Sequence, residues 1–132
     1  MDETTTEFSF ILKPVEHGIG VFATHDIKQD TYLRLFGSET PETDVSVIRK
    51  AGDVPELFRS YCVYRKNDEL VAPQDFGRIE ICYYLNHSKN PNVYHSQIYD
   101  CYAKRDIRAG EEITIDYNEL DEPEEYKQDY YK

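Results

Sequence analysis

The sequence predicts a mainly β fold with short helices, in which several small antiparallel sheets form one domain. Its apolar segments are short and are bounded by glycine or proline, which is typical of short strands. The chain does not alternate strands with long amphipathic helices, so βαβ units are not expected. At 132 residues it has the length of one compact domain with a single core.

The N-terminal part contains three expected strands. They cover residues 8–13, 21–23 and 31–36. Partial alternation of apolar residues marks the first strand, which we expect to end at Pro14. Gly18 and Gly20 indicate a tight turn into the second strand, where missing side chains let a ligand approach the backbone. Gly37 follows the third strand.

The middle of the chain, residues 38–75, is polar and rich in turn residues. Pro41-Glu42-Thr43-Asp44 has the pattern of a helix start. The apolar residues that would face a core from this helix are Val45, Val47 and Ile48. Pro55-Glu56-Leu57-Phe58 begins a second helix or a turn.

The C-terminal half returns to short strands. Those expected are residues 93–95, 99–103 and 113–117, with a turn over 105–110 and an apolar segment over 79–85 that leads into Asn86. Residues 118–132 form an acidic, tyrosine-rich tail with Pro123 at the first position of a potential helix. We expect this tail either to close a binding site with Tyr126, Tyr130 or Tyr131, or to be a frayed terminus.

Acidic residues outnumber basic ones 26 to 15, which gives a net charge of -11. This charge disfavours direct binding to nucleic acid and favours basic partners, although it could equally serve solubility. No apolar run approaches the roughly 20 residues of a membrane helix. The first residues lack the pattern of a secretory signal, so we expect an intracellular protein.

Three cysteines are widely spaced and form no Cys-x-x-Cys pair: Cys62, Cys82 and Cys101. This pattern favours reduced thiols that pack in the interior. A metal site formed by His87 with Cys82 or His95 is not expected, because zinc ligands are usually spaced more tightly.

Three segments carry the strongest functional signal. They are Gly18-Ile19-Gly20-Val21-Phe22-Ala23, Asn86-His87-Ser88-Lys89-Asn90-Pro91-Asn92 and Gly110-Glu111-Glu112-Ile113-Thr114-Ile115-Asp116-Tyr117. In this order they resemble the signature segments of the SET-domain lysine methyltransferases. Each segment alone is weak, since a Gly-x-Gly is usually a hairpin turn and Asn-His-Ser could simply end a helix.

The resemblance implies a SET-domain fold, with small sheets around a knot-like crossing of the C-terminal part. It covers residues 1–132 as a single domain, with 38–75 as the variable insert that shapes the substrate groove and 118–132 as the tail. All three cysteines precede Tyr117, so we do not expect the cysteine-rich cluster that follows many SET domains. The chain resembles the minimal, stand-alone viral and bacterial members.

The resemblance also implies a cofactor, S-adenosyl-L-methionine, and assigns residues to it. The cofactor-binding positions are Gly18, Ile19, Gly20, Asn86 and His87. In this assignment the side chain of Asn86 contacts the amino group of the cofactor and the backbone of His87 meets the adenine.

Tyr117 is the expected catalytic residue, with its hydroxyl beside the transferred methyl group and the lysine nitrogen. The alternative is a core tyrosine, in a chain with 12 tyrosines. Leu35, Tyr94 and Ile115 are the expected lining of the substrate channel, and Tyr94 would limit the number of methyl groups. Many relatives have Tyr-x-Gly where this chain has Leu35-Phe36-Gly37, so one channel hydroxyl is missing.

These observations predict a protein-lysine N-methyltransferase that acts on a basic protein such as a histone. The alternative is a SET-like module with little or no activity that binds a basic partner; an acidic mimic of nucleic acid would rest on charge alone. The expected location is the cytoplasm, or the nucleus and chromatin if the protein is eukaryotic or viral. The sequence leaves open the target lysine, the methylation state and whether a homodimer completes the site.

Overall fold

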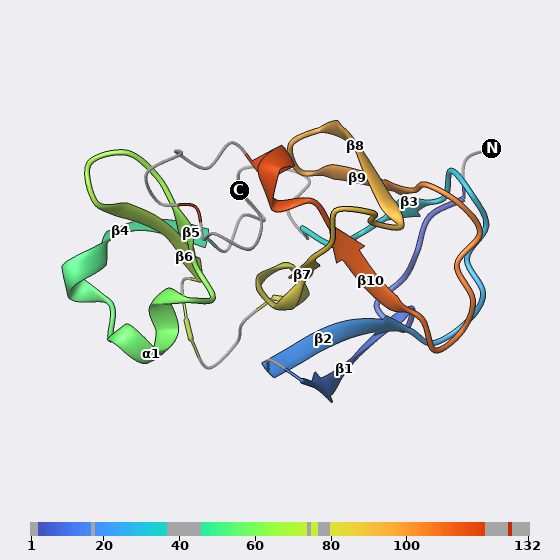
Figure 1. Ribbon diagram of the computed structural model, residues 1–132, viewed down its shortest axis with the longest axis horizontal. Coiled ribbons are helices and arrows are strands. Elements are labelled where there is room, and N and C mark those ends of the chain that lie inside the picture. Colours follow the sequence, from blue (N-terminus) through green and yellow to red (C-terminus); the bar gives the residue numbers. More distant parts are fainter. Residues whose placement is uncertain are drawn as a thin grey trace.

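The computed structural model describes residues 3–16, 18–36, 46–73, 75–76, 80–120 and 127 (Figure 1). Within these ranges the chain forms three small sheets and one short α-helix, together with 3-10 turns at Ala51–Asp53, Ile81–Tyr84 and Tyr117–Leu120. The expected mainly β fold with short helices is therefore confirmed. None of the helices in these ranges has the length and apolar character needed to cross a membrane.

The first sheet has the strand order β1-β2-β10-β7. Its strands are β1 (Phe10–Val15), β2 (Gly18–Ala23), β10 (Glu112–Ile115) and β7 (Asn86–His87). Strand β2 pairs antiparallel with β1 and β10, whereas β7 and β10 are parallel. The sheets are thus mainly, not wholly, antiparallel.

Two boundaries in this sheet differ from the expectation. Strand β1 continues through Pro14 to Val15, because β1 lies at the sheet edge, where a residue without an N–H is tolerated. The glycines at 18 and 20 lie inside β2 and do not form a turn before it.

The second sheet has the order β3-β9-β8, with β3 at Tyr32–Leu33, β9 at Asp100–Ala103 and β8 at Val93–Gln97. The strand expected over 31–36 is only two residues long, while the two expected near 93 and 99 are confirmed. Tyr32 and Tyr94 both pair with Tyr102 across the sheet, and the rings of Tyr94 and Tyr102 stack at 5.5 Å.

The third sheet lies in the middle of the chain and stands at one end of the molecule, on the left of Figure 1. It has the order β4-β6-β5, with β4 at Ser46–Lys50, β6 at Glu69–Pro73 and β5 at Val63–Tyr64. The short helix α1 (Glu56–Arg59) confirms the helix expected near Pro55. Buried residues of this unit are Val54, Leu70, Ala72 and Pro73.

The prediction of a helix that begins near residue 41 is wrong for Val47 and Ile48. Both lie in strand β4, and Ile48 is 52% exposed, so it does not face a core. The proposed helix start over 41–44 and Val45 lie outside the described residues, as do Gly37, Tyr126, Tyr130 and Tyr131.

The main core lies between the first and second sheets. Its residues include Val21, Leu33, Leu35, Leu85, Val93, Cys101, Ala103, Ile107, Ile113 and Ile115. Cys62, Cys82 and Cys101 are free thiols, and burial raises the pKa of Cys101 to about 12. A thiol with this pKa remains protonated and behaves as a small apolar side chain.

Two loops that are far apart in the sequence lie side by side and hold each other through their backbones. The N–H of Ile27 donates to the carbonyl of Ile107, and the N–H of Ile107 donates to the carbonyl of Ile27, both at 2.7 Å. Each isoleucine follows an aspartate in a similar Asp-Ile stretch. The two loops therefore form a reciprocal pair that joins the N-terminal and C-terminal parts of the fold.

The two aspartates make the same exchange with their side chains. Asp106 Oδ1 accepts from the N–H of Gln29, and Asp26 Oδ1 accepts from the N–H of Ala109, both at 2.8 Å. Each carboxylate thus satisfies a backbone donor in the other loop, across about 80 residues of sequence.

We expect Asp26→Ala and Asp106→Ala each to lower the free energy of unfolding by about 1 kcal/mol, the usual net value of a hydrogen bond. Urea denaturation measures this loss, and Asp53→Ala, an exposed aspartate of the 3-10 turn at Ala51–Asp53, is the control. Equal stability of all three variants would contradict the reciprocal role.

Candidate functional site

The parallel pairing of β7 with β10 brings two of the three motifs together. Asn86 pairs with Thr114 and His87 pairs with Ile115. Strand β2, which carries the glycine motif, lies on the other edge of β10. Three segments that are far apart in the sequence therefore meet in one sheet, near the centre of the molecule (Figure 1).

Asn86 and His87 point to opposite faces of this sheet, because successive side chains of a strand alternate. His87 shares the face of Ile115, which belongs to the core, and its side chain is only 5% exposed. Asn86 shares the face of Thr114. We name this second side of the sheet the polar face; it carries Gly20, Phe22, Asn86, Glu112 and Thr114.

The side chain of Asn86 is fixed by two acceptors on the polar face. Its Nδ2 donates to the carbonyl oxygen of Ile19 at 3.1 Å and to Oε2 of Glu112 at 2.7 Å. A carbonyl and a carboxylate can only accept, so the nitrogen of the amide must face them. Oδ1 of Asn86 is consequently left as an acceptor for another group.

Gly18 and Gly20 are suited to their positions in β2 for different structural reasons. A Cβ on Gly20 would lie 2.5 Å from Oε2 of Glu112 and 3.1 Å from Cγ1 of Val15. Gly20 therefore makes room for a carboxylate of the protein, a role that the sequence did not indicate. Gly18 has φ +133° and no atom near its would-be Cβ, so its requirement comes from the backbone.

Tyr117 is held at both its backbone and its hydroxyl by the segment that contains β7. Its hydroxyl donates to the carbonyl of Leu85 at 2.6 Å, and its N–H donates to Nδ1 of His87 at 3.0 Å. The rings of His87 and Tyr117 are 5.2 Å apart. Strand β10 ends at Ile115, so Tyr117 begins a 3-10 turn and does not end the strand as expected.

The bond from Tyr117 fixes the protonation of His87. Because Nδ1 accepts the Tyr117 N–H, the imidazole is neutral and carries its proton on Nε2. Burial lowers the pKa of His87; the carboxylate of Asp116, 3.6 Å from Nδ1, opposes this shift, and the cation of Lys89 reinforces it. A proton on Nδ1 would remove the acceptor that holds Tyr117.

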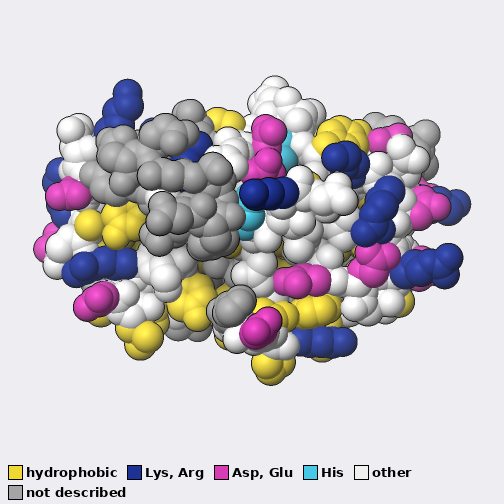
Figure 2. All heavy atoms as spheres, viewed as in Figure 1, with side chains coloured by type: hydrophobic (Ala, Val, Ile, Leu, Met, Phe, Trp, Pro, Cys, Tyr) yellow, Lys and Arg dark blue, Asp and Glu magenta, His cyan; other side chains and the backbone are white. Residues whose placement is uncertain are grey.

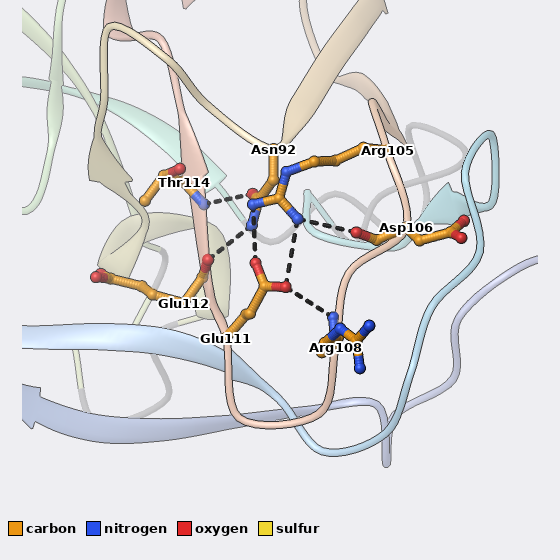
Figure 3. Close-up of polar contacts among 7 residues, drawn as sticks. All are labelled: Asn92, Arg105, Asp106, Arg108, Glu111, Glu112 and Thr114. Atoms are coloured by element: carbon orange, nitrogen blue, oxygen red, sulfur yellow. Dashed lines mark hydrogen bonds and ion pairs between the residues drawn. The ribbon is translucent and has the colours of Figure 1, made fainter.

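Asn92 supports β10 from the same edge as β7 (Figure 3). Its Nδ2 donates to the carbonyl of Glu112 at 2.8 Å, and its Oδ1 accepts from the N–H of Thr114 at 3.0 Å. The buried amide thus replaces a neighbouring strand at this point. The sequence placed Asn92 at the end of the second motif but did not indicate this role, because a buried asparagine beside a strand has no local signal.

The neighbouring glutamates of the third motif have separate partners. Glu111 forms an ion pair with Arg105 at 2.8 Å and accepts the N–H of Arg108 at 3.0 Å (Figure 3). The hydrogen bond from Arg105 is the main cause that lowers the pKa of Glu111. Glu111 therefore orders the loop before β10, whereas Glu112 projects onto the polar face beside Asn86.

Two of the three expected channel residues lie in the core beside Tyr117, and the third, Tyr94, does not belong to that core. Leu35 and Ile115 are buried in the main core, against which Tyr117 packs. Tyr94 points away from that core, since its neighbour Val93 fills it, and the Tyr94 hydroxyl donates to Asp30 at 2.9 Å. The contacts of the Tyr94 hydroxyl and ring are thus with Asp30 and Tyr102.

Comparison with known proteins identifies a family. The SET domain family model matches residues 18–118. The chain is 30% identical over 118 residues to the histone-lysine N-methyltransferase trr of Drosophila melanogaster, covering 83% of this chain and 5% of that protein. It is 28% identical over 109 residues to a histone-lysine N-methyltransferase of Candida albicans described as H3 lysine-36 specific, covering 76% of this chain and 13% of that protein.

The chain therefore spans only a small part of the length of these curated relatives. Among solved structures, it is similar to a Plasmodium falciparum protein assigned as a histone methyltransferase. The TM-score is 0.48 at 20% identity, with 83% of this chain and 93% of that chain covered.

We expect Asn92→Ala to lower the free energy of unfolding by roughly 2 kcal/mol or more. It leaves the Thr114 N–H and the Glu112 carbonyl without their partner, and each unsatisfied group costs about 1–3 kcal/mol. Urea denaturation measures the loss, with the exposed Asn90→Ala in the same loop as control. A loss no larger than that of the control would contradict the supporting role of Asn92.

The pKa of His87 predicts a pH dependence of stability. Because folding lowers this pKa, the unfolded chain binds a proton that the folded chain does not. The stability contributed by neutral His87 is complete above its ordinary pKa of about 6.5 and is lost as the pH falls through the folded pKa. Denaturation measured from about pH 7 to about pH 5 should therefore show a shallower fall for His87→Gln than for the wild type. An unchanged slope would assign the dependence to another group.

Proposed function

The chain belongs to the SET domain family, and from that premise we propose that it transfers a methyl group from S-adenosylmethionine to a lysine side chain of a basic protein such as a histone. The observation that carries this proposal is the meeting of Ile19, Asn86 and Tyr117 in one sheet region. The relatives, described as histone-lysine N-methyltransferases, support the class of substrate.

The residues on the polar face fit the cofactor. S-adenosylmethionine supplies an electrophilic methyl group on a sulfonium, and its amino-acid end carries an ammonium that needs acceptors. The carbonyl of Ile19 and Oδ1 of Asn86 are acceptors side by side. Within this proposal Gly18 and Gly20 keep the β2 backbone accessible. His87 contributes only through its backbone, because its side chain faces the core.

Tyr117 would orient the lysine amine. Its hydroxyl hydrogen is directed to the carbonyl of Leu85, so its oxygen can accept an N–H of the amine and aim the nitrogen lone pair at the methyl carbon. Bound S-adenosylmethionine would supply the electrophilic methyl group, so that the N–C bond would form as the C–S bond breaks and S-adenosylhomocysteine would leave. The amine must first lose a proton, which costs roughly 4–5 kcal/mol at pH 7 from a pKa of about 10.4. Apolar surroundings reduce that cost because they disfavour the ammonium.

The net charge of -11 is consistent with a basic substrate. Figure 2 shows acidic and basic side chains interspersed on one face, so attraction there would come from the diffuse charge and not from one acidic cluster. We propose nuclear or chromatin association on the basis of the relatives' descriptions.

Incubation with radiolabelled S-adenosylmethionine and histones, followed by mass spectrometry of the modified peptide, tests the proposed function. Labelled lysine is the expected result. If correctly folded protein binds histones but transfers no label, the alternative of an inactive SET-like module is favoured. The buried Leu35, which stands where many relatives have a channel tyrosine, would support that alternative.

We expect Tyr117→Phe to reduce the single-turnover rate by about 5- to 150-fold, the effect of losing roughly 1–3 kcal/mol of a hydrogen bond in the transition state. The matched control is Tyr102→Phe, which removes a hydroxyl from the ring stacked on Tyr94 and should leave the rate unchanged. A wild-type rate for Tyr117→Phe would show that the catalytic residue lies elsewhere.

A further inference from the structure

We propose that the carboxylate of Glu112 is the counter-ion for the ammonium group at the amino-acid end of the cofactor. This inference rests on the proposed function and adds a charged residue to the cofactor site. It comes from the position of Glu112 between Gly20 and Asn86, two residues assigned to the cofactor from the sequence.

The carboxylate is positioned by the sheet. Glu112 pairs with Phe22 across β10 and β2, and its side chain leans along the polar face until Oε2 reaches the amide of Asn86 at 2.7 Å. The same oxygen occupies the space that a Cβ at position 20 would need. The backbone of β2 at Gly20 and the carboxylate of Glu112 therefore lie in close contact.

The charge of Glu112 lacks a cation of the protein. Within the described parts of the chain, no lysine or arginine forms an ion pair with it, in contrast to Glu111, which is paired with Arg105. Lys13 lies opposite Gly20 in the register of β1 and β2, but its Nζ lies over the ring of Phe22, 5.2 Å from the centroid. The partly buried carboxylate accepts its hydrogen bond from the neutral amide of Asn86.

The acceptors around this point match the chemistry of an ammonium group. Such a group has three N–H donors and one positive charge. The carbonyl of Ile19, Oδ1 of Asn86 and the carboxylate of Glu112 are three neighbouring acceptors, joined through Nδ2 of Asn86. Only Glu112 among them can neutralise the charge, so it would select adenosine derivatives that carry the amino group.

The test measures binding, not turnover, with two ligands and three proteins. The ligands are S-adenosylhomocysteine and its analogue in which hydrogen replaces the α-amino group, titrated by calorimetry into wild type, Glu112→Gln and Glu111→Gln. Glutamine keeps the acceptor that Asn86 needs. Glu111→Gln makes the same change of net charge one residue away, in a side chain that faces Arg105.

We expect wild type and Glu111→Gln to prefer the amino compound, and Glu112→Gln to lose about tenfold of that preference. An equal preference in all three proteins would overturn the role of Glu112 while leaving the proposed function intact. If wild type binds neither ligand, the proposed function fails and this inference fails with it. Should Glu112→Gln not fold, Glu112→Asp provides the comparison, because its shorter side chain withdraws the charge and should also weaken the preference.

Discussion

The site depends on one short contact, the parallel pairing of Asn86-His87 with Thr114-Ile115. Two paired residues cannot hold two segments by themselves, and the structure reinforces them from both sides. The N–H of Ser88 donates to the carbonyl of Ile115, and the side chain of Asn92 holds the β10 backbone at Glu112 and Thr114. The bonds from Tyr117 to residues 85 and 87 then close the far end.

Because successive side chains of a strand point to opposite faces, the two residues of β7 have different roles. One residue of β7, Asn86, faces the polar side with Glu112, while the next, His87, faces the core and holds the backbone of Tyr117. The neighbouring residues Asn86 and His87 therefore hold different partners: Asn86 holds Glu112, and His87 holds the backbone of Tyr117 in the turn that follows β10. Any shift of β7 by one residue would exchange the two faces and destroy both parts of the site.

Much of the fold and part of the site are encoded in local signals of the sequence. The glycine-bounded strands, the helix at Pro55 and the three motifs are local patterns, and they predicted the family. The roles of Glu112 and Asn92 were not predicted, because their hydrogen-bond partners lie 26 and 20 residues away in the sequence. Local sequence patterns do not indicate contacts over such separations. The segment around Val47, which was expected to be helical, is strand β4 because it pairs with β6. Tyr94 lies on the other face of its strand from buried Val93, a placement that the alternation of side chains along a strand could have indicated.

The placement of Glu112 also bears on the chemistry proposed for Tyr117. A carboxylate near the lysine amine would stabilise its ammonium form and raise the cost of losing the proton. A carboxylate near the cofactor ammonium is instead favourable, because it stabilises a positive charge that persists throughout the reaction. Glu112 contacts the side chain of Asn86, whereas the Tyr117 hydroxyl contacts the carbonyl of Leu85, so the carboxylate and the hydroxyl have different partners. Under the proposed function, these separate contacts let the cofactor ammonium be bound as a cation while the lysine amine reacts in its neutral form.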